Sequence, residues 1–457
     1  MNIPLNGRIA IIDDEIDQAE PLMEVLAKNQ MPYVFYKGND LNYLPNEDER
    51  YNDIRILFLD INLLSGAAKP DVKQVKATLY SVLKKVISPD NFPYSLVFWS
   101  RHQGDHEYSD LVTKLFDDEL KDRKPINIKG FVKSNFFPNY SSERIETDTD
   151  ILEELQKIID SELAYSHILN WENEVHLSAD ETVQDIFSSY HTFVAGWANN
   201  ANFILSKLGN AYLGKRFNSS SEEDKVKSSL VAFSSVFKDS LEHRIHNAII
   251  KPEELDYDPE KVSVGIKAIN EKLNISRSSN SISESGNVVV LKENEPLFKD
   301  LLNKAISFFG FKNRMRLEKP NIADDVLSRE ATKEHKRIKK EVKEKWLKVG
   351  LIVTPVCDFA QNNKYFDRVV NGLLIPFEYK GYIESNSEAV YTLPISIVED
   401  EKDYLLVIDF RYFETCKLTD ENTGKVLFRI RQELLAEVQS KLARHINRQG
   451  ILFLDDR

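Results

Sequence analysis

The first third of the chain alternates short apolar runs with stretches of helical periodicity. Apolar residues recur at intervals of three and four in the helical stretches, as at Leu79, Val82 and Val86. The runs between them are almost continuously apolar, which is typical of strands buried on both faces. This alternation predicts a doubly wound, five-stranded parallel sheet with helices on both faces. The expected strands span residues 8–12, 33–36, 54–59, 95–99 and 126–132, and the expected helices residues 16–29, 72–87 and 110–120.

Later parts of the chain have a different texture. Residues 148–273 carry apolar positions at helical spacing, and a highly charged helix is expected within residues 329–348. Beyond residue 349, apolar runs separated by polar turns indicate β-strands, and a final amphipathic helix is expected over residues 429–447. We therefore predict an α/β domain over residues 1–147, a mostly helical region over 148–348 and a small β-rich domain over 349–457.

Composition narrows the class of protein. The chain has 457 residues, of which 42% are hydrophobic and 29% charged, and its formal net charge is -13. That charge argues against binding of nucleic acid through the whole surface, because phosphate contacts need concentrated positive charge. Two cysteines are too few for a disulfide framework, and no stretch approaches the ~18–20 apolar residues that span a bilayer. We expect a cytoplasmic protein without a membrane partner.

Acidic residues stand at the ends of two expected strands. Asp13 and Asp14 follow the first strand, and Asp60 follows the third. Because the carboxyl ends of parallel strands meet at one edge, we expect these carboxylates to lie together. They would repel one another without a cation, and a set of oxygen ligands selects a hard ion such as Mg²⁺. Ser100 and Lys133 end the fourth and fifth strands, where they could contact the oxygens of a phosphoryl group.

This order of residues resembles the receiver domain of response regulators. The matching stretches are IAIIDDE, ILFLDINLLSG, LVFWSRH and IKGFVKS. The resemblance implies a flavodoxin-like fold, with Asp60 as phosphoacceptor and nucleophile and with Ser100 and Lys133 contacting the phosphoryl group. The implied Mg²⁺ ligands are Asp13, Asp14, Asp60 and the backbone carbonyl of Asn62, and the implied residues that tune dephosphorylation are Asn62 and His102.

The sequence departs from the family near the end of the fifth strand. Gly130 stands three residues before Lys133, where the family usually has an aromatic or histidine switch residue. Phe131 is adjacent but would point to the other face of a strand. The usual coupling between Ser100 and an aromatic side chain is therefore expected to be absent.

Two functions follow from the resemblance. The first is an atypical response regulator that a partner histidine kinase phosphorylates on Asp60 and that acts through protein contacts, a homodimer being compatible with this. The alternative is a phosphate sink that limits activation of a sister response regulator, as in two-component-like antiphage defence operons such as Detocs. In neither case do we expect an enzyme beyond autocatalysed phosphotransfer and dephosphorylation.

A thiol enzyme centred on Cys357 is the third alternative. The segment around it resembles a β-rich module of uncharacterised bacterial proteins, and His445 would be the base. A cysteine nucleophile needs a positioned base, which the sequence does not locate, so this alternative is disfavoured.

Overall fold

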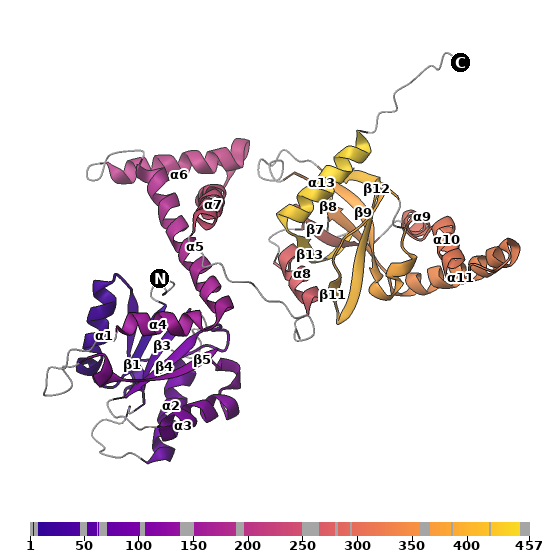
Figure 1. Ribbon diagram of the computed structural model, residues 1–457. Coiled ribbons are helices and arrows are strands. Elements are labelled where there is room, and N and C mark those ends of the chain that lie inside the picture. The colour runs from indigo at the N-terminus through magenta and orange to yellow at the C-terminus, as the bar shows by residue number, and fades with distance from the viewer. Residues whose placement is uncertain are drawn as a thin grey trace. The chain divides into compact units, whose positions relative to one another are not determined.

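The structure is a computed structural model, in which the chain divides into two units (Figure 1). One unit comprises residues 1–200 and 233–251, and the other residues 201–232 and 252–457. The residues that the structure describes are 3, 8–45, 53–61, 63, 71–100, 106–137, 150–188, 196–248, 265–278, 282–292, 295–355, 366–384, 387–419 and 422–447.

A five-stranded parallel sheet forms the centre of the first unit. The strands follow the order β2-β1-β3-β4-β5. The first strand in sequence, β1, therefore has β2 on one side and β3, followed by β4 and β5, on the other. Every residue of β1 and β3 is buried, which explains why these strands are apolar runs without alternation. The strands are β1 (Ile9–Asp13), β2 (Tyr33–Lys37), β3 (Ile56–Asp60), β4 (Ser95–Ser100) and β5 (Asn127–Val132).

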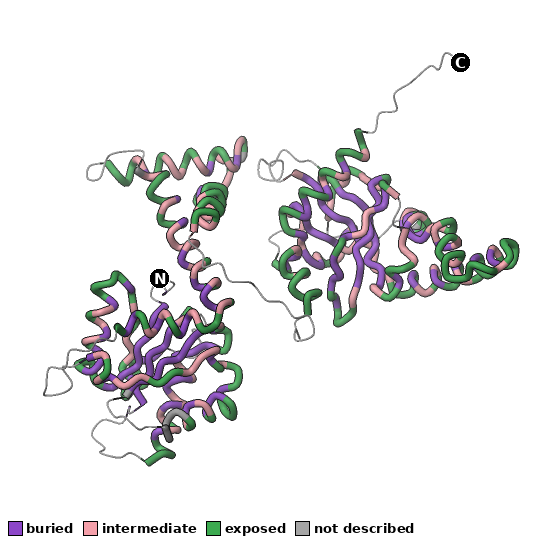
Figure 2. The backbone as a smooth tube through the Cα atoms, viewed as in Figure 1, coloured by how far each residue is buried: buried purple, intermediate pink, exposed green. Residues whose placement is uncertain are grey.

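Helices cover both faces of this sheet, as the sequence predicts. α1 (Ile16–Lys28) and α4 (Ile151–Asp160) share a hydrophobic core with one face. α2 (Val72–Val86) and α3 (His106–Asp118) share a core with the other. Between β2 and β3 the described residues form only a 3-10 turn, Leu41–Tyr43. The predicted doubly wound fold is thus confirmed, and Figure 2 shows its buried strands between partly exposed helices.

An ion-pair cluster joins the long helix α5 (Leu163–Ser188) to the amino edge of the sheet. Glu172 of α5 accepts hydrogen bonds from Arg55 Nε and Nη2, at 3.0 and 2.9 Å, and from Arg8 Nη1. Arg8 immediately precedes β1, and Arg55 immediately precedes β3. The three side chains are only 11–12% exposed. Tyr165 adds a hydrogen bond from its hydroxyl group to the carbonyl oxygen of Arg55.

The helical middle region is also confirmed. It continues with α6 (Trp197–Leu213), α7 (Glu222–Asn247) and α8 (Ile266–Asn274). Arg244 near the end of α7 donates a hydrogen bond to Glu174 of α5 at 2.8 Å. Among the helices that the structure describes, none combines the length and apolar character needed to cross a membrane.

The second unit contains an antiparallel sheet of eight strands in the order β10-β12-β9-β8-β7-β13-β6, with β11 paired to β12. Its predicted β-rich character is confirmed. Strands β6, β7 and β13 were not predicted, and the first two of these lie in residues assigned to the helical region. The strands are β6 (Ile275–Ser276), β7 (Asn287–Leu291), β8 (Leu347–Ile352), β9 (Asp367–Pro376), β10 (Val390–Thr392), β11 (Ile397–Glu399), β12 (Lys402–Cys416) and β13 (Thr423–Ile430).

Different helices cover the two faces of this second sheet. The final helix α13 (Gln432–Ile446) packs on the face that contains Leu374 and Leu406. The other face contains Leu373, Ile375 and Val407 and is covered by α9, α10 and α11. Residues that follow one another along β9 thus face opposite cores, as expected for a strand. The three helices span Glu295–Ala305, Phe308–Glu318 and Asp324–Lys345.

Replacing Glu172 by glutamine should destabilise the first unit. The substitution removes the carboxylate that two largely buried guanidinium groups share, and we expect the free energy of unfolding to fall by about 3 kcal/mol. Asp180→Asn is the matched control, because Asp180 lies on an exposed position of the same helix. Urea denaturation measures both variants, and equal stability of Glu172→Gln and Asp180→Asn would contradict a structural role for the ion pair.

Candidate functional site

The carboxyl edge of the parallel sheet gathers acidic side chains from two adjacent strands. β1 ends at Asp13 and is followed by Asp14, while β3 ends at Asp60. Since β1 has β2 on one side and β3 on the other, the strand order reverses here, which is the position where open α/β sheets usually bind their ligands. All three carboxyl groups are buried, and they offer oxygen atoms that lie within 4.8 Å of one another. The structure thus brings together the acidic residues that the sequence predicts as a cluster.

Lys133 bridges two of these carboxylates. It follows β5 at the start of a 3-10 turn, Lys133–Asn135, and its side chain is fully buried. Its Nζ atom donates to Asp13 Oδ2 at 2.8 Å, to Asp60 Oδ2 at 3.0 Å and to Gln18 Oε1 at 3.3 Å. An ammonium group has three N–H donors, so these acceptors satisfy it.

An aromatic ring completes the surroundings of the ammonium group. Lys133 Nζ lies 4.5 Å from the centroid of the Trp99 ring, in the range of a cation–π contact. Trp99 is fully buried on β4, with its ring centroid 5.7 Å from that of Phe58 and 6.4 Å from that of Phe137. The indole therefore takes the place of water on one side of Lys133.

The electrostatic balance of the cluster is negative. Burial and the neighbouring charge of Asp60 raise the pKa of Asp13 to about 6, and the Lys133 ammonium offsets only part of this increase. Burial and Asp60 also raise the pKa of Asp14. When all three carboxylates are ionised they exceed the charge of Lys133 by two, so a divalent cation would restore neutrality.

The donor set fits such an ion. Asp13, Asp14 and Asp60 offer oxygen atoms, which hard cations prefer, and their burial would exclude competing water. The cluster could therefore bind a metal ion, in accord with the predicted cation site.

The remaining predicted residues are described in part or not at all. The backbone of Ser100 ends β4 and pairs with Val132 of β5, which places Ser100 at the same edge of the sheet. Its side chain lies outside the described residues, as do Asn62, His102 and Cys357.

Two residues near the Lys133 ammonium were not anticipated. Gln18 lies in the first turn of α1, and Trp99 immediately precedes Ser100. The position of Trp99 could have been predicted from the sequence. Side chains alternate along a strand, so the ring of Trp99 had to enter the core on the face opposite that of Phe98. The sequence gives no comparable signal for Gln18, whose contact depends on how α1 packs.

The position of Gly130 has a structural explanation. In the register of β4 and β5, Gly130 pairs with Phe98, and a Cβ atom at residue 130 would lie 2.5 Å from the Phe98 ring. The ring of Phe98 therefore fills the space in which a side chain at position 130 would begin. An aromatic residue there would require Phe98 to move.

In metal-free protein, stability should decrease as the pH rises from about 4 to about 6. The folded-state pKa of Asp13 is about 6, above the ordinary value of 3.8, so folding favours the protonated carboxyl group. This advantage is present below the ordinary pKa, decreases between the two values and is lost once the pH has passed the folded-state pKa. Asp13→Asn should raise the unfolding free energy at pH 7 by about 1–3 kcal/mol and flatten the profile.

Thermal unfolding in the presence of EDTA measures this dependence. Asp110→Asn, at an exposed position of α3, is the control and should keep the pH profile of the wild type. Parallel pH profiles for Asp13→Asn and the wild type would contradict the raised pKa of Asp13.

Comparison of the chain with protein-family models, with curated proteins and with solved structures gives no significant match in any of the three. What the site does must therefore be inferred from its geometry and chemistry. The observed arrangement, a buried cluster of three aspartates with one lysine at the carboxyl edge of a 2-1-3-4-5 parallel sheet, is compatible with a receiver-like fold.

Proposed function

We propose that Asp60 accepts a phosphoryl group from a partner histidine kinase in a reaction that requires Mg²⁺. The observation that carries this proposal is the shared hydrogen bonding of Lys133 Nζ to Asp60 and Asp13, beside the carboxylate of Asp14. Phosphoryl transfer depends mainly on positioning and on neutralising charge, and this site combines a carboxylate nucleophile with a buried cation.

The chain's own residues would supply the nucleophile and most of the groups that contact the phosphoryl group. A carboxylate oxygen of Asp60 attacks the phosphorus of a phosphohistidine; a P–O bond forms as the P–N bond breaks, and the leaving imidazole takes up a proton. Mg²⁺ held by Asp13, Asp14 and Asp60 would neutralise phosphoryl oxygens. Lys133 would exchange its hydrogen bond to Asp60 for one to the phosphoryl group, since its three donors are already occupied. Ser100, at the end of β4, would donate its hydroxyl group to another phosphoryl oxygen.

Phosphorylation would then alter the contacts of the cluster. Asp60 is hydrogen-bonded to Lys133 before the reaction, whereas an acyl phosphate would place negative charge farther from β3. A movement of Lys133 would change its contact with the Trp99 ring. Because Trp99 belongs to the core that α1 and α4 cover, this change would alter the packing of that core. We infer that output passes from this unit to other proteins through such a change.

Phosphoramidate should phosphorylate the purified protein once per chain in the presence of Mg²⁺ and not in the presence of EDTA. Asp60→Asn should abolish labelling, because the amide is not a nucleophile for this reaction. Asp110→Asn should be labelled like the wild type, since Asp110 is exposed on α3. Intact-protein mass spectrometry measures the added phosphoryl group.

Beryllofluoride gives a second readout that does not depend on the lifetime of the phosphorylated form. It should bind to the wild type with Mg²⁺ and not to Asp60→Asn, provided that both have the same circular dichroism spectrum. Labelling of Asp60→Asn at the wild-type level, or no beryllofluoride binding to the wild type, would contradict the proposal.

The phosphate-sink alternative uses the same chemistry at Asp60 and differs in its consequence. Added to a histidine kinase and its sister response regulator, the wild type should lower phosphorylation of the regulator in proportion to its concentration, and Asp60→Asn should not. A regulator that is phosphorylated equally with and without the protein would exclude this role.

A further inference from the structure

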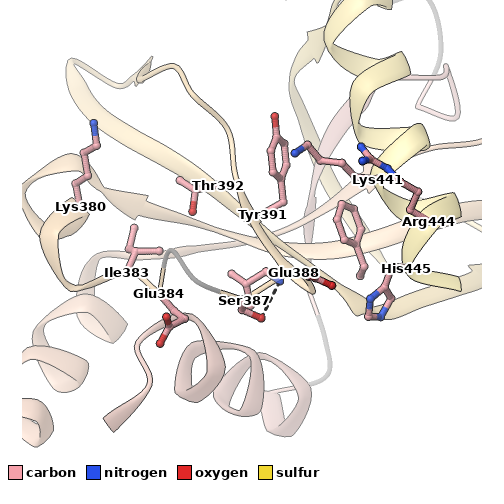
Figure 3. Close-up of a pocket in the computed structure, with 12 residues that line it drawn as sticks. Lys380, Ile383, Glu384, Ser387, Glu388, Tyr391, Thr392, Lys441, Arg444 and His445 are labelled. Carbon is pink, nitrogen blue, oxygen red and sulfur yellow. Dashed lines mark hydrogen bonds between the residues drawn. The ribbon is translucent and has the colours of Figure 1, made fainter. Parts of the chain in front are cut away.

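A cavity of about 620 Å³ lies between α13 and the β10 edge of the second sheet (Figure 3). Its volume is within the range of small-molecule sites in proteins. One wall is formed by α13, and the opposite side by residues on either side of positions 385–386, among them Ile383, Glu384 and Ser387. All of its lining residues belong to the second unit, so the cavity is independent of the Asp60 site.

Three nitrogen-bearing side chains of α13 line one wall. Lys441, Arg444 and His445 lie three and four residues apart, which places them on one face of the helix (Figure 3). Lys441 Nζ lies 4.7 Å from the centroid of the Tyr391 ring and 3.6 Å from Glu437 Oε1, so an anionic ligand would compete with Glu437 for this ammonium group. Arg444 is exposed, so its guanidinium group can reach a ligand without being drawn from a core.

His445 adds a buried polar atom. Its Nδ1 is inaccessible to solvent and has no hydrogen-bond partner among the described residues. The imidazole packs beside Phe410, with ring centroids 6.1 Å apart, and Phe410 in turn stacks with Tyr391. A buried polar atom without a partner is costly. A ligand in the cavity reaches this atom only when the imidazole turns, and that turn would give it a partner and remove the cost.

The opposite side of the cavity is polar and partly acidic. Glu384 accepts a hydrogen bond from Ser307 Oγ at 2.5 Å, which directs its carboxylate toward the start of α10 and away from the wall formed by α13. Ser387 and Thr392 also line this side. Hydroxyl and carboxylate oxygens of this kind can accept hydrogen bonds from the hydroxyl or amino groups of an organic ligand.

We propose that this cavity binds a small organic phosphate of about mononucleotide size. The phosphate group would face Arg444, Lys441 and His445, and the polar organic part would face Ser387, Thr392 and Glu384. A phosphate matches the wall better than a carboxylate does, because it carries more charge and has more acceptor oxygens for several separate donors. The aromatic rings of Tyr391 and Phe410 provide apolar contact between the two ends.

Calorimetric titration of the full chain tests the proposal, with EDTA present so that the carboxylate cluster of the first unit holds no metal. The probes are adenosine monophosphate and glucose 6-phosphate, with adenosine as the uncharged comparison. We expect at least one of the two phosphates to bind, and adenosine to bind about ten-fold or more weakly than adenosine monophosphate.

Variants assign the binding to this wall. The double substitution Arg444→Gln with His445→Gln should weaken phosphate binding about ten-fold or more, because it removes a charge-assisted hydrogen bond and the buried donor or acceptor. Arg444→Gln alone, at an exposed position, is the second variant in case the double variant does not fold. Lys340→Gln, exposed on α11 of the same unit, is the control and should bind like the wild type.

Three results would overturn the proposal. These are the absence of binding by both phosphates, binding of adenosine as tight as that of its monophosphate, and unchanged affinity in the folded Arg444 variants. Each would show that the wall formed by α13 does not recognise a phosphate group.

Discussion

The first unit depends on a cluster of three buried carboxylates, two of which, Asp13 and Asp60, share one ammonium group. Each of these side chains comes from the carboxyl end of a strand or the residue that follows it, so the parallel arrangement of the strands creates the cluster. The same arrangement requires the compensating cation, because like charges at this distance in a low-dielectric site repel strongly. Lys133 supplies part of that compensation from a third strand end, and the ring of Trp99 limits the access of water to it.

The second unit shows how differently a buried acid behaves when cations are in excess. Burial alone would raise the pKa of Glu399, yet hydrogen bonds from Lys425 and Arg277 lower it. At Asp13, one ammonium is shared with a second carboxylate, and the pKa rises. The ion pairs of Glu399 therefore fully compensate its charge. At the Asp13 site, the positive charge is too small to compensate the carboxylates. Such an imbalance is typical of functional sites.

Much of the first unit could be predicted because its signals are local. Short runs rich in apolar residues identified the five strands, and the strand ends identified Asp13, Asp14 and Asp60 as neighbours. The contacts of Lys133 could not be predicted in the same way, since its choice of acceptors depends on side-chain packing around Trp99 and Gln18. In the second unit, β13 pairs with β7, which lies more than a hundred residues earlier, and no local pattern indicates such a partner. The expected final helix therefore began a few residues early, where the end of β13 carries similar apolar residues.

The contacts of α5 with the sheet determine which fragment of the chain can fold as the first unit. α4 and the first turns of α5 complete the core on one face of the sheet, through residues such as Leu155 and Leu169. Glu172, farther along α5, also neutralises the guanidinium groups at the amino edge. A recombinant fragment that stops before α4 would expose this apolar face and leave two largely buried arginines without the carboxylate that they share. A fragment that unfolds with native cooperativity must therefore include α5 beyond Glu172.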